Sequence, residues 1–118
     1  REHAPQGIAR WGIRAIAGVS FAEIFFSNAT TLGMACVSMA PAEASELAQM
    51  VERAPETVVI VDLPARHVRA GARQWAVSIP VSAREALMAG TWDATVLLTA
   101  DFDVVRKAAA RLPYITGF

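Results

Sequence analysis

Hydrophobic residues recur at helical spacing in several parts of the chain, and short apolar runs lie between those parts. The spacing predicts a first helix over residues 4–11, which Gly12 ends. A second helix is expected to begin at Ser20, which has the capping-box spacing to Glu23, and to end before Gly33, which suits a left-handed cap. The pattern therefore places two helices in the first third of the chain.

Three further helices are indicated by residues typical of helix N-termini, namely a proline, a capping-box serine and an aspartate. A glycine or a proline follows each of the three stretches and is expected to terminate it. These helices are predicted over residues 41–54, 82–89 and 101–112.

The apolar runs between the helices are short, as expected of strands, and the run over residues 57–63 is rich in β-branched residues. A turn at residues 64–66 separates that run from the loosely alternating residues 67–77, which predicts a hairpin. Two more strands are expected over residues 13–17 and 34–39, while residues 91–99 fit either a short strand or a turn of helix. Helices that alternate with short strands predict an α/β fold, a mixed sheet flanked by helices.

Length and composition favour one ordered domain, because 118 residues with 54% hydrophobic and 19% charged side chains can form a core. Eleven basic side chains balance eleven acidic ones, so no general attraction to nucleic acid or to an anionic membrane is expected. The apolar runs are much shorter than the roughly 20 residues that span a bilayer. The single cysteine, Cys36, excludes an internal disulfide bond and is typical of a reducing compartment, so the cytoplasm is the expected location.

The possible metal ligands with imidazole or thiol groups are few and widely separated: His3, Cys36 and His67. They form no ligand-spacing motif, and one thiol cannot hold an iron–sulfur cluster, which needs several. We therefore expect Cys36 to be buried in a strand and His67 to lie at the surface near a turn. No metal or cofactor ligand is predicted within this chain.

Residues for covalent or acid–base catalysis are equally scarce, because no serine lies in a nucleophile-elbow pattern. Asp101 and Asp103 stand at a helix start, where the macrodipole stabilises negative charge. The amides at the Ser20 helix start are suited either to their own cap or to a bound carboxylate or phosphate. Arg1 presents a guanidinium fork that matches a carboxylate, which makes it the best candidate for binding an anion.

Several residue types in the first third of the chain follow one another in a characteristic order: Arg1-Glu2-His3-Ala4-Pro5, Gly12, Ser20-Phe21-Ala22, Ile24-Phe25, Asn28 and Gly33. This order resembles the swivel domain of the aconitase superfamily, and the motif that ends in proline is commonest in small subunits of 3-isopropylmalate dehydratase. Weaker similarities follow at residues 62–63, 89–93 and 112–114. The resemblance implies that residues 1–118 form a single swivel-type domain that lacks its N-terminal portion.

The resemblance also implies a chemistry. Enzymes of this family are hydro-lyases that move a hydroxyl group between neighbouring carbons of a small di- or tricarboxylic acid. For the small subunit, this implies interconversion of 2-isopropylmalate and 3-isopropylmalate through isopropylmaleate, in leucine biosynthesis. A [4Fe-4S] cluster held by a partner large subunit acts as the Lewis acid, and a serine removes the carbon-bound proton.

Within this chain the resemblance assigns substrate-carboxylate binding to Arg1, and it assigns Glu2 and His3 to orienting the loop and helix start. The family's catalytic serine is expected upstream of Arg1, so no catalytic residue is expected in this chain and the fragment alone is expected to be inactive. Removal of early strands is also expected to expose sheet edges and promote association.

Two alternatives remain open at this stage. Gln6 stands where many small subunits have a bulky aromatic residue, which keeps related substrates such as 2,3-dimethylmalate, methylmalate or maleate in consideration. The lack of a complete catalytic set also fits a non-catalytic α/β interaction module.

Overall fold

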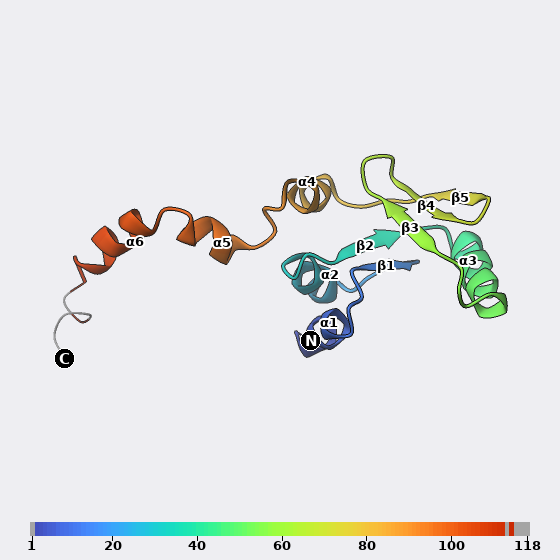
Figure 1. The fold of residues 1–118 in the computed structure, drawn as a ribbon, viewed down its shortest axis with the longest axis horizontal. Helices are drawn as coiled ribbons and strands as arrows, with labels where there is room; N and C mark the ends of the chain where they lie inside the picture. Colours follow the sequence, from blue (N-terminus) through green and yellow to red (C-terminus); the bar gives the residue numbers. More distant parts are fainter. Residues whose placement is uncertain (1, 113, 115–118) are drawn as a thin grey trace.

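The computed structural model describes residues 2–112 and 114, and in that part helices and strands alternate along the chain (Figure 1). The helices are α1 (His3–Arg10), α2 (Glu23–Thr30), α3 (Pro41–Arg53), α4 (Val81–Ala89), α5 (Ala94–Thr99) and α6 (Phe102–Ala109). The strands are β1 (Ala15–Gly18), β2 (Ala35–Ser38), β3 (Val59–Asp62), β4 (His67–Ala70) and β5 (Arg73–Ala76).

The strands form two small sheets rather than one. β1 and β2 are parallel and are joined through α2, with Gly18 opposite Ser38 at their carboxyl ends. β3, β4 and β5 form an antiparallel sheet in that order. The backbones of Ser38 and Ser78 exchange two hydrogen bonds, of 2.8 and 2.7 Å, which connect the two sheets. The predicted α/β fold with parallel and antiparallel pairing is confirmed, although the strands divide between two sheets.

β2 contributes side chains to two hydrophobic clusters, one on each of its faces. Side chains alternate between the faces of a strand, so Val37 joins the cluster that contains Leu47 of α3 and Trp75 of β5. Cys36 points the other way, into a cluster with Met34 beneath α1 and α2. The expected burial of Cys36 in a strand is therefore confirmed.

The last two helices extend away from the remainder of the molecule. We call α5 and α6, residues 94–109, the arm, and residues 2–93 the body; Figure 1 shows the arm projecting to the left of the body. The described chain measures 63 × 26 × 24 Å and has a radius of gyration of 18.9 Å, whereas a compact chain of this length has about 13.5 Å. The arm is responsible for this elongation.

The two predicted capping boxes are wrong. α2 begins at Glu23 rather than Ser20, and neither α2 nor α4 has a side-chain cap. Before α2 the chain stays extended so that Phe21 can fold back, and a Cβ on Gly18 would lie only 3.2 Å from the Phe21 ring. This tertiary contact outweighs the local gain from a serine cap. α4 begins directly after Pro80, which places Ser82 inside the helix.

The other differences come from turns and caps. Residues 67–77 form two strands instead of one, because Gly71 adopts a left-handed φ of 55° and reverses the chain between β4 and β5. The ambiguous stretch 91–99 contains the helix α5, whose N-cap Asp93 accepts hydrogen bonds from the amides of Thr95 and Val96. The predicted cap by Asp101 is confirmed, since its carboxylate accepts from the amide of Val104 at 3.3 Å.

Candidate functional site

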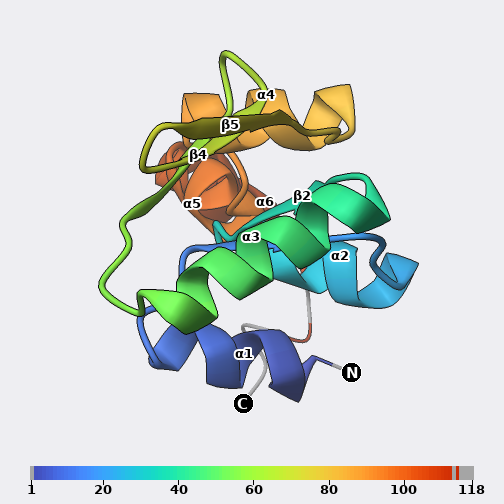
Figure 2. The same ribbon diagram turned by 90° about the vertical axis from the view of Figure 1, so that its right-hand side faces the viewer.

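The candidate site lies at the end of the molecule where the first helices begin. β1 and β2 are parallel, so their carboxyl ends meet at one edge, and α2 and α3 both start from that edge. Figure 2 shows that the N-terminal ends of α1, α2 and α3 all lie on its right-hand side. Helix N-termini carry unpaired amides and partial positive charge, so this end of the body favours an anionic ligand.

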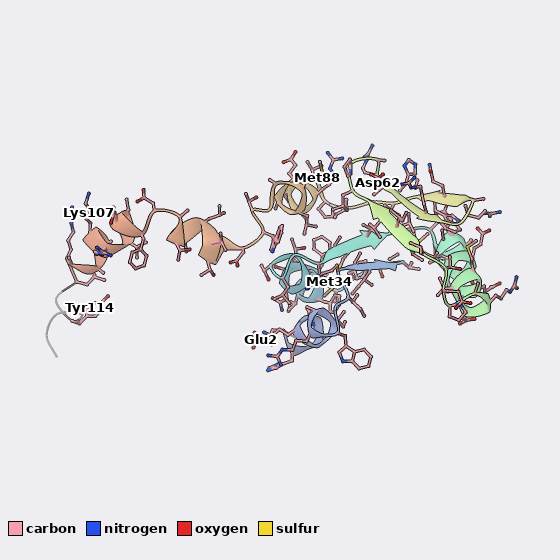
Figure 3. All side chains as sticks on the ribbon, in the orientation of Figure 1. Glu2, Met34, Asp62, Met88, Lys107 and Tyr114 are labelled. Atoms are coloured by element: carbon pink, nitrogen blue, oxygen red, sulfur yellow. The ribbon has the colours of Figure 1, made fainter. Side chains whose placement is uncertain are left out.

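Arg1, the predicted substrate-binding residue, lies outside the described residues. Its neighbour Glu2 is exposed (Figure 3), and the carbonyl oxygen of Glu2 accepts a hydrogen bond of 3.3 Å from the amide of Gln6. Glu2 therefore joins the first turn of α1 through its backbone, while its side chain makes no cap. The structure brings Glu2 and the exposed His3 to the helix start, and their orienting role stays a prediction.

His3 also lines a shallow hollow of about 440 Å³ on the outer side of α1. Trp11 and Ile13 also line this hollow, and Trp11 is 89% exposed. The hollow is mostly apolar, and the polar side-chain groups that line it are the His3 imidazole and the Trp11 indole N–H, so it offers no Arg or Lys side chain to pair with a carboxylate. It is therefore a less suitable anion site than the helix N-termini.

Ser20 lies in the segment that follows the carboxyl end of β1 and precedes α2. Its side chain is exposed and does not cap α2, which corrects the predicted role of this residue. The first turn of α2 carries Glu23, whose negative charge is stabilised by the helix macrodipole. An anion bound at these amides would have to lie away from the Glu23 carboxylate.

The possible metal ligands are not brought together. Within residues 2–112 and 114, no three side chains of the types His, Cys, Asp and Glu are grouped so as to hold a metal ion. Cys36 is buried, and burial raises the pKa of its thiol, which disfavours the thiolate that binds iron. His67 is partly buried at the start of β4, directly after the turn. The donor set of this chain therefore does not fit an iron–sulfur cluster.

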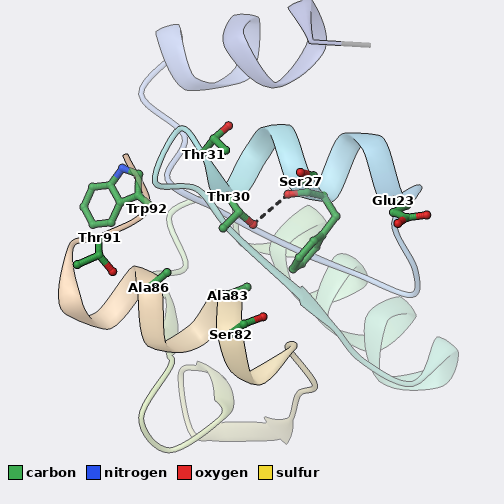
Figure 4. A pocket seen from close by; sticks show the side chains of 10 residues that line it. Glu23, Ser27, Thr30, Thr31, Ser82, Ala83, Ala86, Thr91 and Trp92 are labelled. Atoms are coloured by element: carbon green, nitrogen blue, oxygen red, sulfur yellow. Dashed lines mark hydrogen bonds between the residues drawn. The ribbon is translucent and has the colours of Figure 1, made fainter. Parts of the chain in front are cut away.

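A second hollow, which the sequence did not indicate, lies between α2 and α4 (Figure 4). It has a volume of about 430 Å³, and the hydroxyl groups of Ser27, Thr30 and Ser82 line it together with Glu23 and Trp92. Glu23 is its only ionisable group among the lining residues. Because that carboxylate repels another one, this hollow is suited to a neutral polar group and not to a dicarboxylate.

One carboxylate in the described part of the body connects a helix to a sheet, away from the candidate site. Glu46 of α3 accepts a hydrogen bond from the Trp75 indole and pairs with Arg73 of β5. These two donors hold the pKa of Glu46 below its ordinary value. The contact links α3 to the antiparallel sheet and has a structural role.

No helix in the part of the chain that the structure describes is both long enough and apolar enough to cross a membrane.

Comparison with known proteins gives a partial family match at the candidate site. The sequence model of the aconitase C-terminal domain matches residues 1–42, a range that contains α1, β1, α2 and β2. The match therefore covers the elements that form the anion-favouring end of the body, and it does not extend to the antiparallel sheet or the arm.

Several relatives, each named 3-isopropylmalate dehydratase small subunit, are similar to nearly the whole chain. The relative from Thermus thermophilus is 46% identical over 97% of this chain and 57% of its own length. A second, from Synechocystis sp., is 37% identical over 98% of this chain and 58% of its own length. A third, from Salinispora arenicola, is 34% identical over 98% and 59%. The chain thus spans somewhat more than half the length of the curated relatives that it matches.

Proposed function

We propose that the chain serves as the small subunit of a 3-isopropylmalate dehydratase. The proposal is supported by its similarity to such subunits over nearly its whole length and by the match of residues 1–42 to the aconitase C-terminal domain. The reaction interconverts 2-isopropylmalate and 3-isopropylmalate through isopropylmaleate, in leucine biosynthesis in the cytoplasm. The observation that carries the proposal is the 46% identity over 97% of the chain. The family model, which matches residues 1–42, adds the range that contains the Arg1–Pro5 motif.

In this proposal the chain supplies the part of the site that binds the substrate. Arg1 directly precedes Glu2 and α1 in the sequence, so its guanidinium would hold one substrate carboxylate in a bidentate pair. The N-terminal ends of α1 and α2 add partial positive charge on the same side of the body. Together these groups are suited to orienting a dicarboxylate, while Glu2 and His3 fix the start of α1.

The iron–sulfur cluster is assigned to a partner large subunit. When bound, such a cluster supplies the Lewis acid for the substrate hydroxyl group. The sequence offers one thiol, Cys36, which is buried beneath α1 and α2 with a raised pKa. That donor set supports a division of labour in which this chain binds the substrate and a partner holds the metal.

The proton-transferring serine is assigned to the residues that precede Arg1 in the family motif. Ser20 lies just beyond the carboxyl end of β1 and Ser38 at the carboxyl end of β2, near the candidate site. Their positions explain why neither is assigned to proton transfer. Ser20 is exposed in the segment before α2, and Ser38 uses its backbone to connect the two sheets. Within the described residues neither serine side chain forms a hydrogen bond with a histidine that would serve as its base, so the proposal does not route proton transfer through them.

The decisive experiment combines the small subunit with its large subunit. The complete reading frame that contains Arg1 is co-expressed with a 3-isopropylmalate dehydratase large subunit from the same genome, and the cluster is reconstituted without oxygen. Loss of the isopropylmaleate double bond is followed by ultraviolet absorbance. We expect hydration of isopropylmaleate, and absence of turnover with an intact cluster would refute the proposal.

The same assay discriminates between substrates. Dimethylmaleate, methylmaleate and maleate are offered in parallel, because Gln6 leaves the preference for the isopropyl group untested. Gln6 is exposed and lines a hollow together with Arg10 and Leu32. We expect isopropylmaleate to give the highest kcat/KM. A kcat/KM ten times higher for another acid would instead identify that acid as the substrate.

A further inference from the structure

A hollow of about 420 Å³ lies beside the last turns of α1, and two arginines line it. Arg10 is in the last turn of α1, and Arg14 directly precedes β1. The candidate site lies at the other ends of both elements, where α1 starts and where β1 finishes. We call this hollow, whose lining residues are Gln6, Ala9, Arg10, Arg14 and Leu32, the basic hollow.

The polar side chains of the basic hollow come from a helix and from the start of a strand. Gln6 and Arg10 are four residues apart on α1, so they lie on the same face of that helix. The carbonyl oxygen of Arg14 accepts a hydrogen bond of 3.0 Å from the amide of Ala35, which holds this residue against β2. Two guanidinium groups and one amide can therefore act together on one ligand in this hollow.

The surroundings of the basic hollow are poor in negative charge. Its lining includes no aspartate or glutamate, and the ion pairs in the part of the chain that the structure describes involve neither Arg10 nor Arg14. The sequence from residue 3 to residue 42 contains a single acidic residue, Glu23. Glu23 starts α2, which is about 12 Å long, whereas Leu32 follows the end of that helix. This length exceeds the Debye length of about 10 Å, so Glu23 offsets little of the positive charge.

The ends of α1 and α2 offset only part of the charge of the two arginines. A helix C-terminus carries roughly half a negative charge, so one role of Arg10 is to stabilise the end of α1. Two helix ends together supply about one negative charge, whereas two guanidinium groups supply two positive ones. The basic hollow therefore keeps an excess of positive charge. Three of the other described hollows contain a glutamate instead, namely Glu23, Glu43 or Glu46.

We propose that the basic hollow is a second anion-binding site, in which Arg10 and Arg14 hold one oxyanion group, a carboxylate or a phosphate. The guanidinium fork matches the oxygen atoms of both groups, and its charge persists at any working pH. The Gln6 amide adds a neutral hydrogen-bond donor. The site is separate from Arg1, so the proposal does not depend on the proposed enzymatic function.

Isothermal titration calorimetry tests binding at the basic hollow. The complete protein, expressed from its whole reading frame, carries Arg1→Gln so that the candidate site does not contribute. Inorganic phosphate and malonate are titrated separately at low ionic strength, and we expect at least one of them to bind once per chain. Binding of phosphate alone would identify a phosphate ligand, and binding of malonate alone would identify a carboxylate ligand. Binding of neither would overturn the proposal.

Substitution of each arginine tests the assignment to these residues. Arg10→Gln and Arg14→Gln are each expected to lower the association constant about tenfold or more, because a hydrogen bond between charged groups is lost. Arg53→Gln is the matched control, since Arg53 is also an exposed arginine in the last turn of a helix but lines a different hollow with Glu46. This control should leave the affinity unchanged. An affinity that neither substitution lowers, or that Arg53→Gln lowers equally, would contradict the proposal.

Thermal unfolding separates the site from general effects of salt. An anion that binds the folded protein alone raises Tm by mass action, and kosmotropic anions such as phosphate also stabilise proteins generally. The rise in Tm from sodium chloride to the bound anion, at equal ionic strength, should be larger for the Arg53→Gln control than for a double variant with Arg10→Gln and Arg14→Gln. Both arginines are exposed, so the double variant should stay folded, which circular dichroism checks. An equal rise in both variants would count against the site.

Discussion

The indole Nε1 of Trp75 donates a hydrogen bond of 2.9 Å to Oε2 of Glu46 and thereby joins β5 to α3. The other carboxylate oxygen of Glu46 pairs with Arg73, so one carboxylate holds two residues of the same strand. Trp75 is only 5% exposed and packs in the cluster with Val37 and Leu47. The hydrogen bond therefore satisfies the polar atom of a large side chain in the core.

The Glu46 contact predicts a pH-dependent loss of stability. Its two donors lower the pKa of Glu46, so the stabilisation is present above the ordinary pKa of glutamate and is lost as pH falls through the lowered value. Glu46→Gln removes the charge but keeps an acceptor for Trp75, and Glu46→Ala removes both. We expect Tm to decrease in the order wild type, Gln, Ala at pH 7. Thermal unfolding by circular dichroism measures this order, and the difference between wild type and Gln should shrink in acid.

Gly33 is predicted to tolerate no side chain. Its φ is +72°, and a Cβ there would lie 2.7 Å from the Trp92 indole. Gly33→Ala should therefore destabilise the protein by at least about 1 kcal/mol, since a left-handed conformation alone costs a non-glycine residue about 1–2 kcal/mol. Gly7→Ala is the opposite control, because Gly7 lies inside α1 with open space around it. That change should stabilise by roughly 0.5–1 kcal/mol, and urea titration compares the two; equal effects would contradict the argument.

Much of the local structure could be predicted from the chain because local signals decide it. Pro41 opens α3, Asp101 caps α6 and Gly90 ends α4 in a left-handed conformation, as expected. Ser20 fails as a cap because Phe21 packs back on Gly18. Local spacing carries no information about such a contact, which belongs to the packing of the whole body.

Only part of the candidate site could be predicted from the sequence. The motif at Arg1 indicated the family, and the match to residues 1–42 agrees with it. The hollow between α2 and α4 was not predicted, because it depends on Trp92 reaching Gly33 across a long separation in sequence. The extension of the arm was also not predicted, since its helices have ordinary caps and a regular pattern.

Cys36 is predicted to react slowly in the folded protein. It is 1% exposed, and burial raises the pKa of its thiol, so both access and the thiolate fraction are low. Reaction with an aromatic disulfide reagent at pH 8 should be slower than in urea by a factor on the order of 100 or more, because it requires opening of the structure. Cys36→Ser with Ser78→Cys gives an exposed control thiol, which should react at nearly the unfolded rate. Equal reactivity of the native Cys36 and this control would contradict the burial.

Arg1 is predicted to act on substrate binding more than on the chemical step. Arg1→Lys keeps the positive charge but loses the planar fork, so one of two hydrogen bonds to the carboxylate disappears. We expect KM to rise about tenfold, which corresponds to about 1.4 kcal/mol, while kcat changes less. The measurement is steady-state hydration of isopropylmaleate by the complex with the large subunit. Arg53→Lys, at the exposed end of α3, is the matched control and should leave both constants unchanged. A loss confined to kcat would instead assign Arg1 to the chemical step.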